Sequence, residues 1–523
     1  MLKRYLLGLA AILTMSVATP ALAADCSSLA SLALTGGRVT AAELVPAGQF
    51  QPPPNPMGPP PGVGPGAYAG LPAFCRVQAT LTPSPDSDIK VEVWLPARGW
   101  NGKYVGIGNG IWAGQLSTSQ LGEPLSRGYA VATTDTGHTG TGLTADFAIG
   151  HPEKLVDFGH RAVHEMTVAA KRLIAAFYGK GPALSFWNSC STGGRQGLME
   201  AYRYPEDYDA ISAMAPANPM TDLMAQSMWV GIKAQRSPAA TLSLPKLALL
   251  HKAAIAQCDM LDGLADGLIG RPDACGFDPA TIQCKAGDAA DCLTGEQVDT
   301  AHALYGGVRD PETGAQLLPG WPVGSEMQLA ALISAPQPFP VALTYYAMLV
   351  FGSQPGWDFR SFDFARDTLA GRRFGAAILD VPYDGLGAFF ARGGKLLMSH
   401  GWTDGLIPAN NSLRFYRGLY ASLPPEQAQR QLRLFMVPGM DHCAGGEGTS
   451  TFDTLGTIDT WASTGLAPDR IIATRTSTVA MPGMPAAPQR PPISRPLCPY
   501  PLYARYDGDG DEAEAASFTC VAP

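Results

Sequence analysis

The chain lacks several features that would place it in other classes of protein. Its 37 Lys and Arg residues are outnumbered by 45 Asp and Glu residues, which gives a formal net charge of -8. Without a basic patch, the chain is a poor candidate for binding nucleic acid or anionic membrane surfaces. None of its ten cysteines falls in a C-x-x-C pair. An even number of cysteines in an exported chain predicts disulfides rather than zinc ligands.

Long apolar runs are absent after the N-terminus. Residues 1–23 have a basic opening at Lys3 and Arg4, an apolar middle, and the small-residue site Ala21-Leu22-Ala23. This pattern predicts a cleaved signal peptide, because the apolar middle is interrupted and too short to span a bilayer. We therefore expect a secreted or periplasmic protein with no membrane partner.

The chain also lacks a full G-x-S-x-G motif, but one stretch comes close to it. An apolar run from Leu184 ends at Ser189-Cys190-Ser191-Thr192-Gly193, and a helix-compatible segment follows from Gln196 to Arg203. A strand, a sharp turn and a helix with serine at the apex make a nucleophile elbow, which needs small residues two positions either side of the serine. Ser189 and Gly193 occupy these positions. The alternative is a Ser- and Gly-rich loop with no catalytic role.

Two later segments place an acid and a histidine after short apolar runs. The run at 396–398 leads to a loop with Asp404, and the run at 435–437 leads to a loop with His442. The chain order Ser191, Asp404, His442, each just past a predicted strand, is that of α/β-hydrolases.

Two cysteines adjoin this predicted triad, because Cys190 precedes Ser191 and Cys443 follows His442. Hydrogen bonding between Ser191 and His442 would bring both cysteines together and make a disulfide sterically reasonable. With these residues the sequence resembles the tannase and feruloyl esterase family, whose mark is Cys-Ser, Asp and His-Cys with bridged cysteines. The resemblance covers nearly the whole mature chain and includes the stretches 161–165 and 204–209.

The resemblance implies a secreted serine carboxylic ester hydrolase that acts on feruloyl, galloyl or related aromatic esters through an acyl-enzyme. Ser191 would be the nucleophile, His442 the base and Asp404 the group that orients it. A terephthalate monoester hydrolase on the same fold and a catalytically inactive, calcium-stabilised binding protein are the alternatives; a peptidase or polyester depolymerase also stays open. The resemblance further implies five disulfides, namely Cys26–Cys75, Cys190–Cys443, Cys258–Cys275, Cys284–Cys292 and Cys498–Cys520.

The expected fold is an α/β-hydrolase sheet with helices on both faces and a large inserted lid domain. Periodicity predicts strands at 90–95, 104–108, 129–133 and 210–215, and a helix from about Val163 to Gly179. The strand–helix rhythm is lost between about 218 and 391, which resembles the family's lid. The predicted domains are therefore a catalytic domain at 24–217 and 392–523 and a lid at 218–391. Aromatic lid residues would either stack on a planar acyl group or form lid core: Trp321, Tyr345, Tyr346, Phe351 and Trp357.

The glycine-rich stretch 108–114 follows a predicted strand, where an α/β-hydrolase supplies one amide of its oxyanion hole. We assign that amide to Gly110 and the other to Thr192, the residue after the nucleophile. A tight turn without a catalytic role is the alternative, and the stretch does not match a dinucleotide-binding fingerprint.

Two groups of residues raise the question of metal binding. Asp259, Asp262 and Asp266 have the tight, glycine-punctuated spacing of an oxygen-rich loop that suits calcium, although Asp-Gly pairs are also common in plain turns. The family resemblance implies calcium held by these three side chains and by the carbonyls of Leu264 and Leu268. His160 and His164 lie one helical turn apart, but no Asp or Cys accompanies them at ligand spacing, which disfavours a metal site there.

Overall fold

The computed structural model describes residues 25–52, 66, 68–475 and 490–523. The predicted signal peptide, residues 1–23, lies outside the described residues. None of the described helices is long and apolar enough to cross a membrane.

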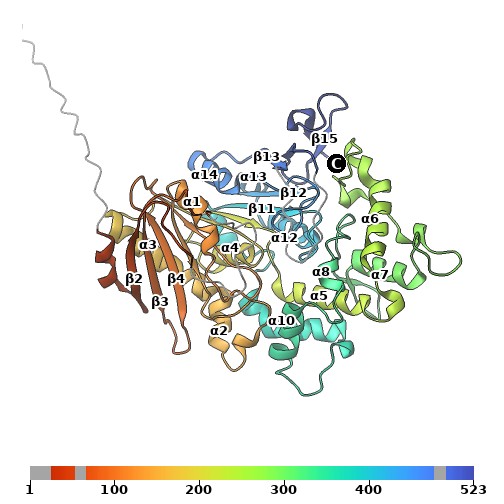
Figure 1. Cartoon of the computed structure of the whole chain (residues 1–523), viewed down its shortest axis with the longest axis horizontal. Helices are drawn as coiled ribbons and strands as arrows, with labels where there is room; N and C mark the ends of the chain where they lie inside the picture. Colours follow the sequence, from red (N-terminus) through yellow and green to blue (C-terminus); the bar gives the residue numbers. More distant parts are fainter. Residues whose placement is uncertain (1–24, 53–65, 67, 476–489) are drawn as a thin grey trace, which may run out of the picture.

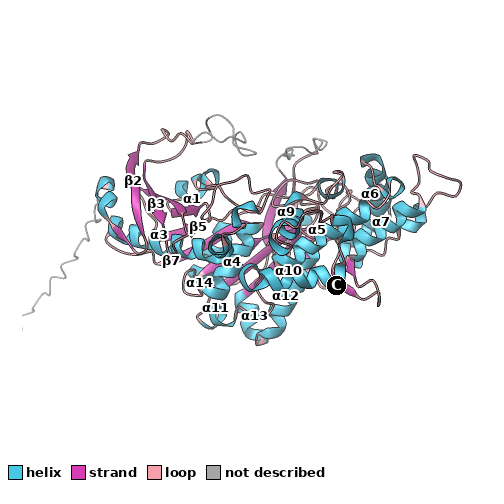
Figure 2. Ribbon diagram, turned by 90° about the horizontal axis from the view of Figure 1, so that it is seen from below, coloured by secondary structure: helices cyan, strands magenta, loops and turns pink. Residues whose placement is uncertain are grey.

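A ten-stranded mixed sheet forms the centre of the molecule (Figures 1 and 2). Its order is β1-β2-β3-β4-β6-β5-β7-β8-β11-β12, antiparallel from β1 to β6 and parallel from β6 to β12. Because β7, β11 and β12 run in parallel, the loops after them meet at one edge of the sheet. The strands are β1 (Ala33–Leu34), β2 (Gly37–Val45), β3 (Phe74–Leu81), β4 (Ile89–Pro96), β5 (Lys103–Gly106), β6 (Ala130–Thr134), β7 (Leu184–Cys190), β8 (Ala210–Met214), β11 (Lys395–Gly401) and β12 (Leu432–Val437).

Helices cover both faces of this sheet, as expected for an α/β fold. One face packs against α3 (Ala162–Tyr178), α4 (Thr192–Arg203), α11 (Gly387–Ala391) and α12 (Ala409–Ser422). The other face packs against α1 (Gly122–Ser126) and α14 (Thr454–Thr464). Two further helices are α2 (Pro152–Val156) and α13 (Pro425–Gln431).

The four strands predicted from periodicity lie within two residues of β4, β5, β6 and β8. The predicted helix is α3, which ends where Gly179 adopts the left-handed conformation (φ 72°). The expected start of the next helix at Gln196 was wrong, because α4 begins at Thr192. Gly193 and Gly194 are weak helix formers, but close packing requires them: a Cβ at Gly194 would lie 2.6 Å from the Met214 carbonyl oxygen.

The segment 218–391, here called the lid, is mainly helical and lies at the right of Figure 1. Its helices are α5 (Met220–Ala234), α6 (Leu244–Cys258), α7 (Gly295–Gly306), α8 (Ala330–Ile333), α9 (Pro340–Thr344) and α10 (Phe364–Leu379), with a hairpin of β9 (Val308–Arg309) and β10 (Gln316–Leu318). Two apolar clusters, separate from those that flank the sheet, form its core, and one of them also includes Trp112, Ala145 and Phe158 from outside the segment. Phe389 and Phe390 of α11, however, pack against the sheet, so the segment that does not pack on the sheet ends before α11.

Two small hairpins follow at the C-terminal end, β13 (Ile471–Arg475) with β14 (Ile493–Leu497) and β15 (Tyr503–Tyr506) with β16 (Phe518–Val521). The strand β15 contacts the short turn Asp259–Asp262 that follows α6 in the lid. Five disulfides are present, in the pairs that the family resemblance implies: Cys26–Cys75, Cys190–Cys443, Cys258–Cys275, Cys284–Cys292 and Cys498–Cys520.

Candidate active site

Ser191 stands at the sharp turn between β7 and α4. Its backbone has φ 65° and ψ -127°, a conformation that L-residues rarely adopt and that is typical of strained functional turns. A Cβ at Gly193 would lie only 2.1 Å from the Ser189 hydroxyl oxygen, so the turn has no room for larger residues at either position. Ser189 in turn accepts a hydrogen bond from the Gly108 amide (3.2 Å). The local chain therefore has the geometry of a nucleophile elbow.

His442 and Asp404 complete a hydrogen-bonded chain with this serine. His442 Nε2 lies 2.9 Å from Ser191 Oγ, and His442 Nδ1 lies 2.7 Å from Asp404 Oδ2. The three residues follow the parallel strands β7, β11 and β12, whose ends meet at one edge of the sheet. The structure thus brings together the serine, acid and histidine selected from the sequence, at distances that allow proton transfer between them.

The Asp404 carboxylate is fully buried and surrounded by donors. Oδ1 accepts hydrogen bonds from the amides of Leu406 and Ile407, both at 2.9 Å, and Oδ2 faces His442 and His400. Burial alone would raise the pKa of Asp404, but the two histidines outweigh it and hold this pKa far below its ordinary value. Asp404 therefore stays ionised despite its burial.

His400 is a contact that the sequence did not reveal. Its Nε2 lies 3.1 Å from Asp404 Oδ2 and 3.1 Å from the Ile407 carbonyl, while its Nδ1 lies 2.8 Å from Ser412 Oγ. From the sequence alone His400 is expected to be structural; the one signal for its position is that it lies four residues before Asp404. It contacts the same carboxylate oxygen as His442.

The charge on Asp404 acts on His442 in return. Burial lowers the pKa of His442, but the charge and the hydrogen bond of Asp404 raise it more, so that the net shift is upward. A histidine with a raised pKa is a stronger base when neutral, which suits a group that must accept the serine proton.

A disulfide clamps the two ends of this arrangement. Cys190 and Cys443, the neighbours of Ser191 and His442, are bridged with their Cα atoms 6.0 Å apart. Their separation in the sequence is 253 residues. The bond therefore connects the elbow directly to the histidine loop.

The loop at 108–114 lies against the start of α4. The Gly193 amide donates to the Asn109 carbonyl oxygen, and Thr192 Oγ1 donates to the Ile111 carbonyl oxygen, both at 2.8 Å. Thr192 is the first residue of α4, where an amide has no acceptor within its own helix. The space beside Gly110 is open, with nothing within 4 Å of the position of a Cβ. Both residues chosen for the oxyanion hole thus lie near Ser191.

The lid aromatics fall into two groups. Trp321, Tyr345 and Tyr346 are buried in the lid core, where Trp321 donates to the Gly405 carbonyl oxygen (3.0 Å) in the Asp404 loop. Of these three, Trp321 thus contacts the Asp404 loop directly, whereas Tyr345 donates to the Gly371 carbonyl oxygen within the lid. Phe351 and Trp357 are less buried and lie 5.3 Å apart between ring centroids.

The loop at 259–268 carries Asp259, Asp262 and Asp266, the acids predicted to bind calcium, although their oxygens do not all lie within 4.8 Å of one another. Burial and the neighbouring Asp266 and Asp259 raise the pKa of Asp262 to about 7. Three acids in so small a loop are electrostatically unfavourable unless a cation or protons neutralise them. Part of this negative charge is already compensated. Asp259 accepts hydrogen bonds from the amides of Gly267 and Leu268, and Asp266 forms an ion pair with Arg495 at 2.8 Å.

Comparison with known proteins is consistent with this site. The model of the family described as tannase and feruloyl esterase matches residues 75–521. The chain is 33% identical to an uncharacterized esterase of Xanthomonas campestris over 99% of this chain and 94% of the relative. It is 32% identical to the mono(2-hydroxyethyl) terephthalate hydrolase of Piscinibacter sakaiensis, over 87% and 86% of the two chains.

Two solved structures are similar over almost their whole length. A crystal structure of an esterase from Aspergillus oryzae superposes with a TM-score of 0.84 at 30% identity, covering 95% of this chain and 99% of that one. Feruloyl esterase B from Aspergillus oryzae superposes with a TM-score of 0.82 at 28% identity and the same coverage. The chain therefore belongs to the tannase and feruloyl esterase family and is a carboxylic ester hydrolase.

Proposed function

We propose that the chain is an exported serine esterase that cleaves aromatic carboxylic esters by means of Ser191, His442 and Asp404. The observation that carries this proposal is the continuous hydrogen-bonded chain from Ser191 Oγ through both nitrogens of His442 to Asp404. The strained elbow at Ser191 and the ionised state of the buried Asp404 support it.

The reaction has two halves. Ser191 Oγ attacks the ester carbonyl carbon while His442 Nε2 takes the hydroxyl proton, and the amides of Thr192 and Gly110 stabilise the negative oxygen that forms. Collapse of this intermediate breaks the ester C–O bond, and His442 returns the proton to the leaving alcohol. A water molecule, deprotonated by His442, then cleaves the acyl-enzyme and regenerates Ser191.

The substrate class follows from the relatives and carries two candidates. Feruloyl esterase B and the mono(2-hydroxyethyl) terephthalate hydrolase, as named, act on esters of planar aromatic acids. A feruloyl or galloyl ester is the first candidate and a terephthalate monoester the second. Comparing kcat/KM for methyl ferulate, methyl gallate and mono(2-hydroxyethyl) terephthalate with the purified mature protein distinguishes them.

Calcium in the lid loop is part of the proposal as a structural ion. The side chains of Asp259, Asp262 and Asp266 with the carbonyls of Leu264 and Leu268 would hold it, because carboxylate and carbonyl oxygens are the ligands that calcium prefers. Its contribution is to neutralise the loop, and no step of ester cleavage depends on it. The signal peptide at 1–23, the lid at 218–391 and export to an oxidising compartment complete the proposal; the five disulfides support export.

The decisive experiment is labelling by a fluorophosphonate, combined with Ser191→Ala. We expect the wild-type protein to be labelled at Ser191 and the variant to lose both labelling and ester hydrolysis, by about 10⁴-fold or more. Ser463→Ala, a change to an exposed serine on α14, is the matched control and should behave as wild type. Turnover by Ser191→Ala close to wild type would contradict the triad. Failure of the folded wild-type protein to take up the probe would favour the inactive binding protein.

A further inference from the structure

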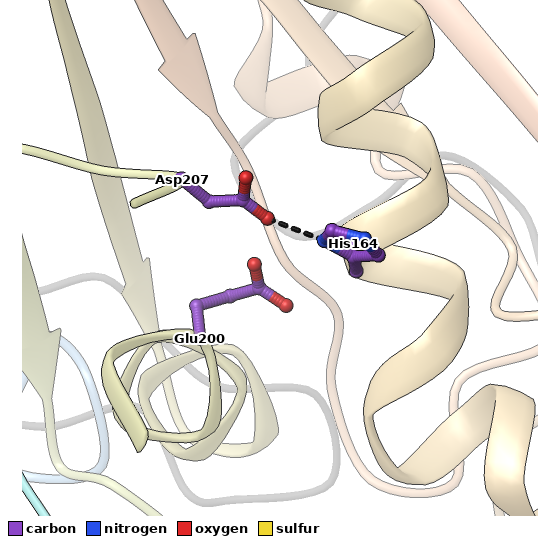
Figure 3. A group of neighbouring side chains, drawn as sticks. All are labelled: His164, Glu200 and Asp207. Carbon is purple, nitrogen blue, oxygen red and sulfur yellow. Dashed lines mark hydrogen bonds and ion pairs between the residues drawn. The ribbon is translucent and has the colours of Figure 1, made fainter. Parts of the chain in front are cut away.

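A second group of ionisable side chains lies at the far end of the nucleophile helix. His164 comes from α3, Glu200 from α4 and Asp207 from the loop between α4 and β8, and they converge in space (Figure 3). One ligand atom from each residue lies within 4.8 Å of the other two. Among the described residues this is the one group of three His, Cys, Asp or Glu side chains whose ligand atoms lie this close together, and the three acids of the lid loop do not meet the same limit.

In the absence of a ligand, Glu200 is the member of the group whose charge is least well compensated. It is 1% exposed, its carboxylate points toward His164 and Asp207 in Figure 3, and neither carboxylate oxygen has a hydrogen-bond partner among the described residues. A buried carboxylate without donors is strongly unfavourable, so a cation or a proton must compensate it.

The side chains around Glu200 provide only partial compensation. Asp207 Oδ2 lies 2.6 Å from His164 Nδ1, and Asp207 Oδ1 lies 4.0 Å from Lys171 Nζ. These contacts compensate the charge of Asp207, whereas both carboxylate oxygens of Glu200 have no hydrogen-bond partner among the described residues. The His164 ring is held in place by stacking on Tyr204, with ring centroids 3.9 Å apart and planes within 10°.

We propose that His164, Glu200 and Asp207 bind a zinc ion. Zinc accepts imidazole nitrogen and carboxylate oxygen together and usually takes four ligands, so three side chains and one water complete its coordination. Calcium is a poorer fit here, because it prefers six to eight oxygen ligands and no imidazole. His164 is partly exposed, which leaves a route for the ion and for the water.

The zinc ion has a structural role. It joins α3, α4 and the loop before β8 at Glu200, whereas the His164–Asp207 contact, the His160–Tyr204 hydrogen bond and the His164–Tyr204 stack link these segments without it. Glu200 lies nine positions after Ser191 along the nucleophile helix, about 13 Å away at 1.5 Å per residue. Zinc at this distance stabilises the helix that presents Ser191 and takes no part in ester cleavage.

The test is a zinc titration of the mature protein, with calcium kept in excess so that the lid loop stays loaded. Protein stripped with chelator is titrated with Zn²⁺ by calorimetry and by thermal unfolding. We expect uptake of one equivalent and a rise in Tm, with kcat unchanged. Glu200→Gln and Asp207→Asn should lose both uptake and the Tm rise, whereas Glu206→Gln, an exposed neighbour of Asp207, should keep both.

Three results would overturn the proposal. The first is no Zn²⁺ uptake by the stripped wild-type protein, which means that Glu200 is instead neutralised by a proton. The second is equal uptake by Glu200→Gln and the wild type. The third is loss of uptake in Asp262→Ala, which would place zinc in the lid loop. If Glu200→Gln fails to fold, His164→Gln, which alters the most exposed ligand, supplies the same comparison.

Discussion

Two loops in this molecule contain carboxylates whose pKa values are shifted in opposite directions. In the loop after β11, Asp404 is fully buried and accepts from two backbone amides, and His442 and His400 keep its pKa far below the ordinary value. In the lid loop, Asp262 is only half-buried, but its pKa is raised to about 7 by burial and by Asp266 and Asp259. At Asp404 the interactions with His442 and His400 outweigh burial, whereas at Asp262 burial and the neighbouring acids outweigh its backbone hydrogen bonds.

This difference explains why the two loops suit different tasks. Asp404 is ionised by the protein's own groups, so it can orient His442 permanently and needs no ion. The lid loop has fewer donors for each carboxylate and carries three acids, so it is suited to a cation. The following changes test this contrast, from the largest expected effect on turnover to the smallest.

Asp404→Asn removes the charge of the first loop while keeping the shape of the side chain. The amide cannot hold His442 in the tautomer that accepts the serine proton, so we expect kcat to fall by about 10⁴-fold. The fold should survive, because the neighbouring backbone contacts are preserved. Steady-state kinetics and a melting curve test this, with the exposed Asp469→Asn as the control. A kcat within a few fold of wild type would show that Asp404 does not orient the base.

The sequence selects Ser191, Asp404 and His442 because each follows an apolar run in a fixed chain order, and the structure places these three side chains within hydrogen-bond distance. It does not predict His400, since nothing in a single sequence shows that the imidazole four residues before Asp404 turns onto the same carboxylate oxygen. The antiparallel strands β1, β2 and β3 are likewise absent from the prediction, and β2 has several exposed residues and no clear alternation.

A single sequence does not show which distant residues meet in the fold, and this explains why the cluster of His164, Glu200 and Asp207 is not predicted. In the sequence, His164 and His160 have no Asp or Cys beside them at the spacing of metal ligands, and this local spacing disfavours a metal site. The fold supplies Glu200 and Asp207, the latter 43 residues further along the chain. Sequence spacing therefore does not predict a cluster whose residues are brought together only by the tertiary structure. It does predict the Asp259–Asp266 loop, because the acids of that loop are close together in the sequence.

Replacing both Cys190 and Cys443 by Ala separates the effect of the disulfide from that of the charges. Without the bond, the His442 loop is free to shift relative to the elbow, and a displacement of about 1 Å can reduce turnover by about 10²-fold. We expect this loss to exceed the effect on Tm. The double variant at Cys284 and Cys292, a bond in the lid, is the control for general destabilisation. Equal losses in the two double variants would argue against a clamp on the site.

The pH dependence of kcat/KM reports on the charge of Asp404 through His442. His442 accepts the serine proton only when neutral, so activity is present above its pKa and is lost as pH falls through it. Because Asp404 raises this pKa, the acid limb should lie above the ordinary histidine value of about 6.5, with a slope of about tenfold per pH unit. In a His400→Gln variant, which preserves a donor but removes an imidazole, the position of the limb should move. An acid limb at or below the ordinary histidine value would contradict a raised pKa for His442.

Removing calcium, or replacing Asp262 by Ala, should change stability and leave the chemistry intact. Three acids between Asp259 and Asp266 repel one another, and an ion bound only by the folded loop stabilises the fold by mass action, by about 2.7 kcal/mol at a hundredfold excess over its dissociation constant. Chelation should therefore lower Tm while kcat at a temperature below unfolding stays at the wild-type value, and calcium should restore Tm in the wild type but not in Asp262→Ala. Asp273→Ala, which removes an acid outside this loop, should respond to calcium as the wild type does. If elemental analysis finds no calcium and chelator leaves Tm unchanged, the Asp-Gly run is a set of turns, and the contrast with Asp404 reduces to burial and hydrogen bonding.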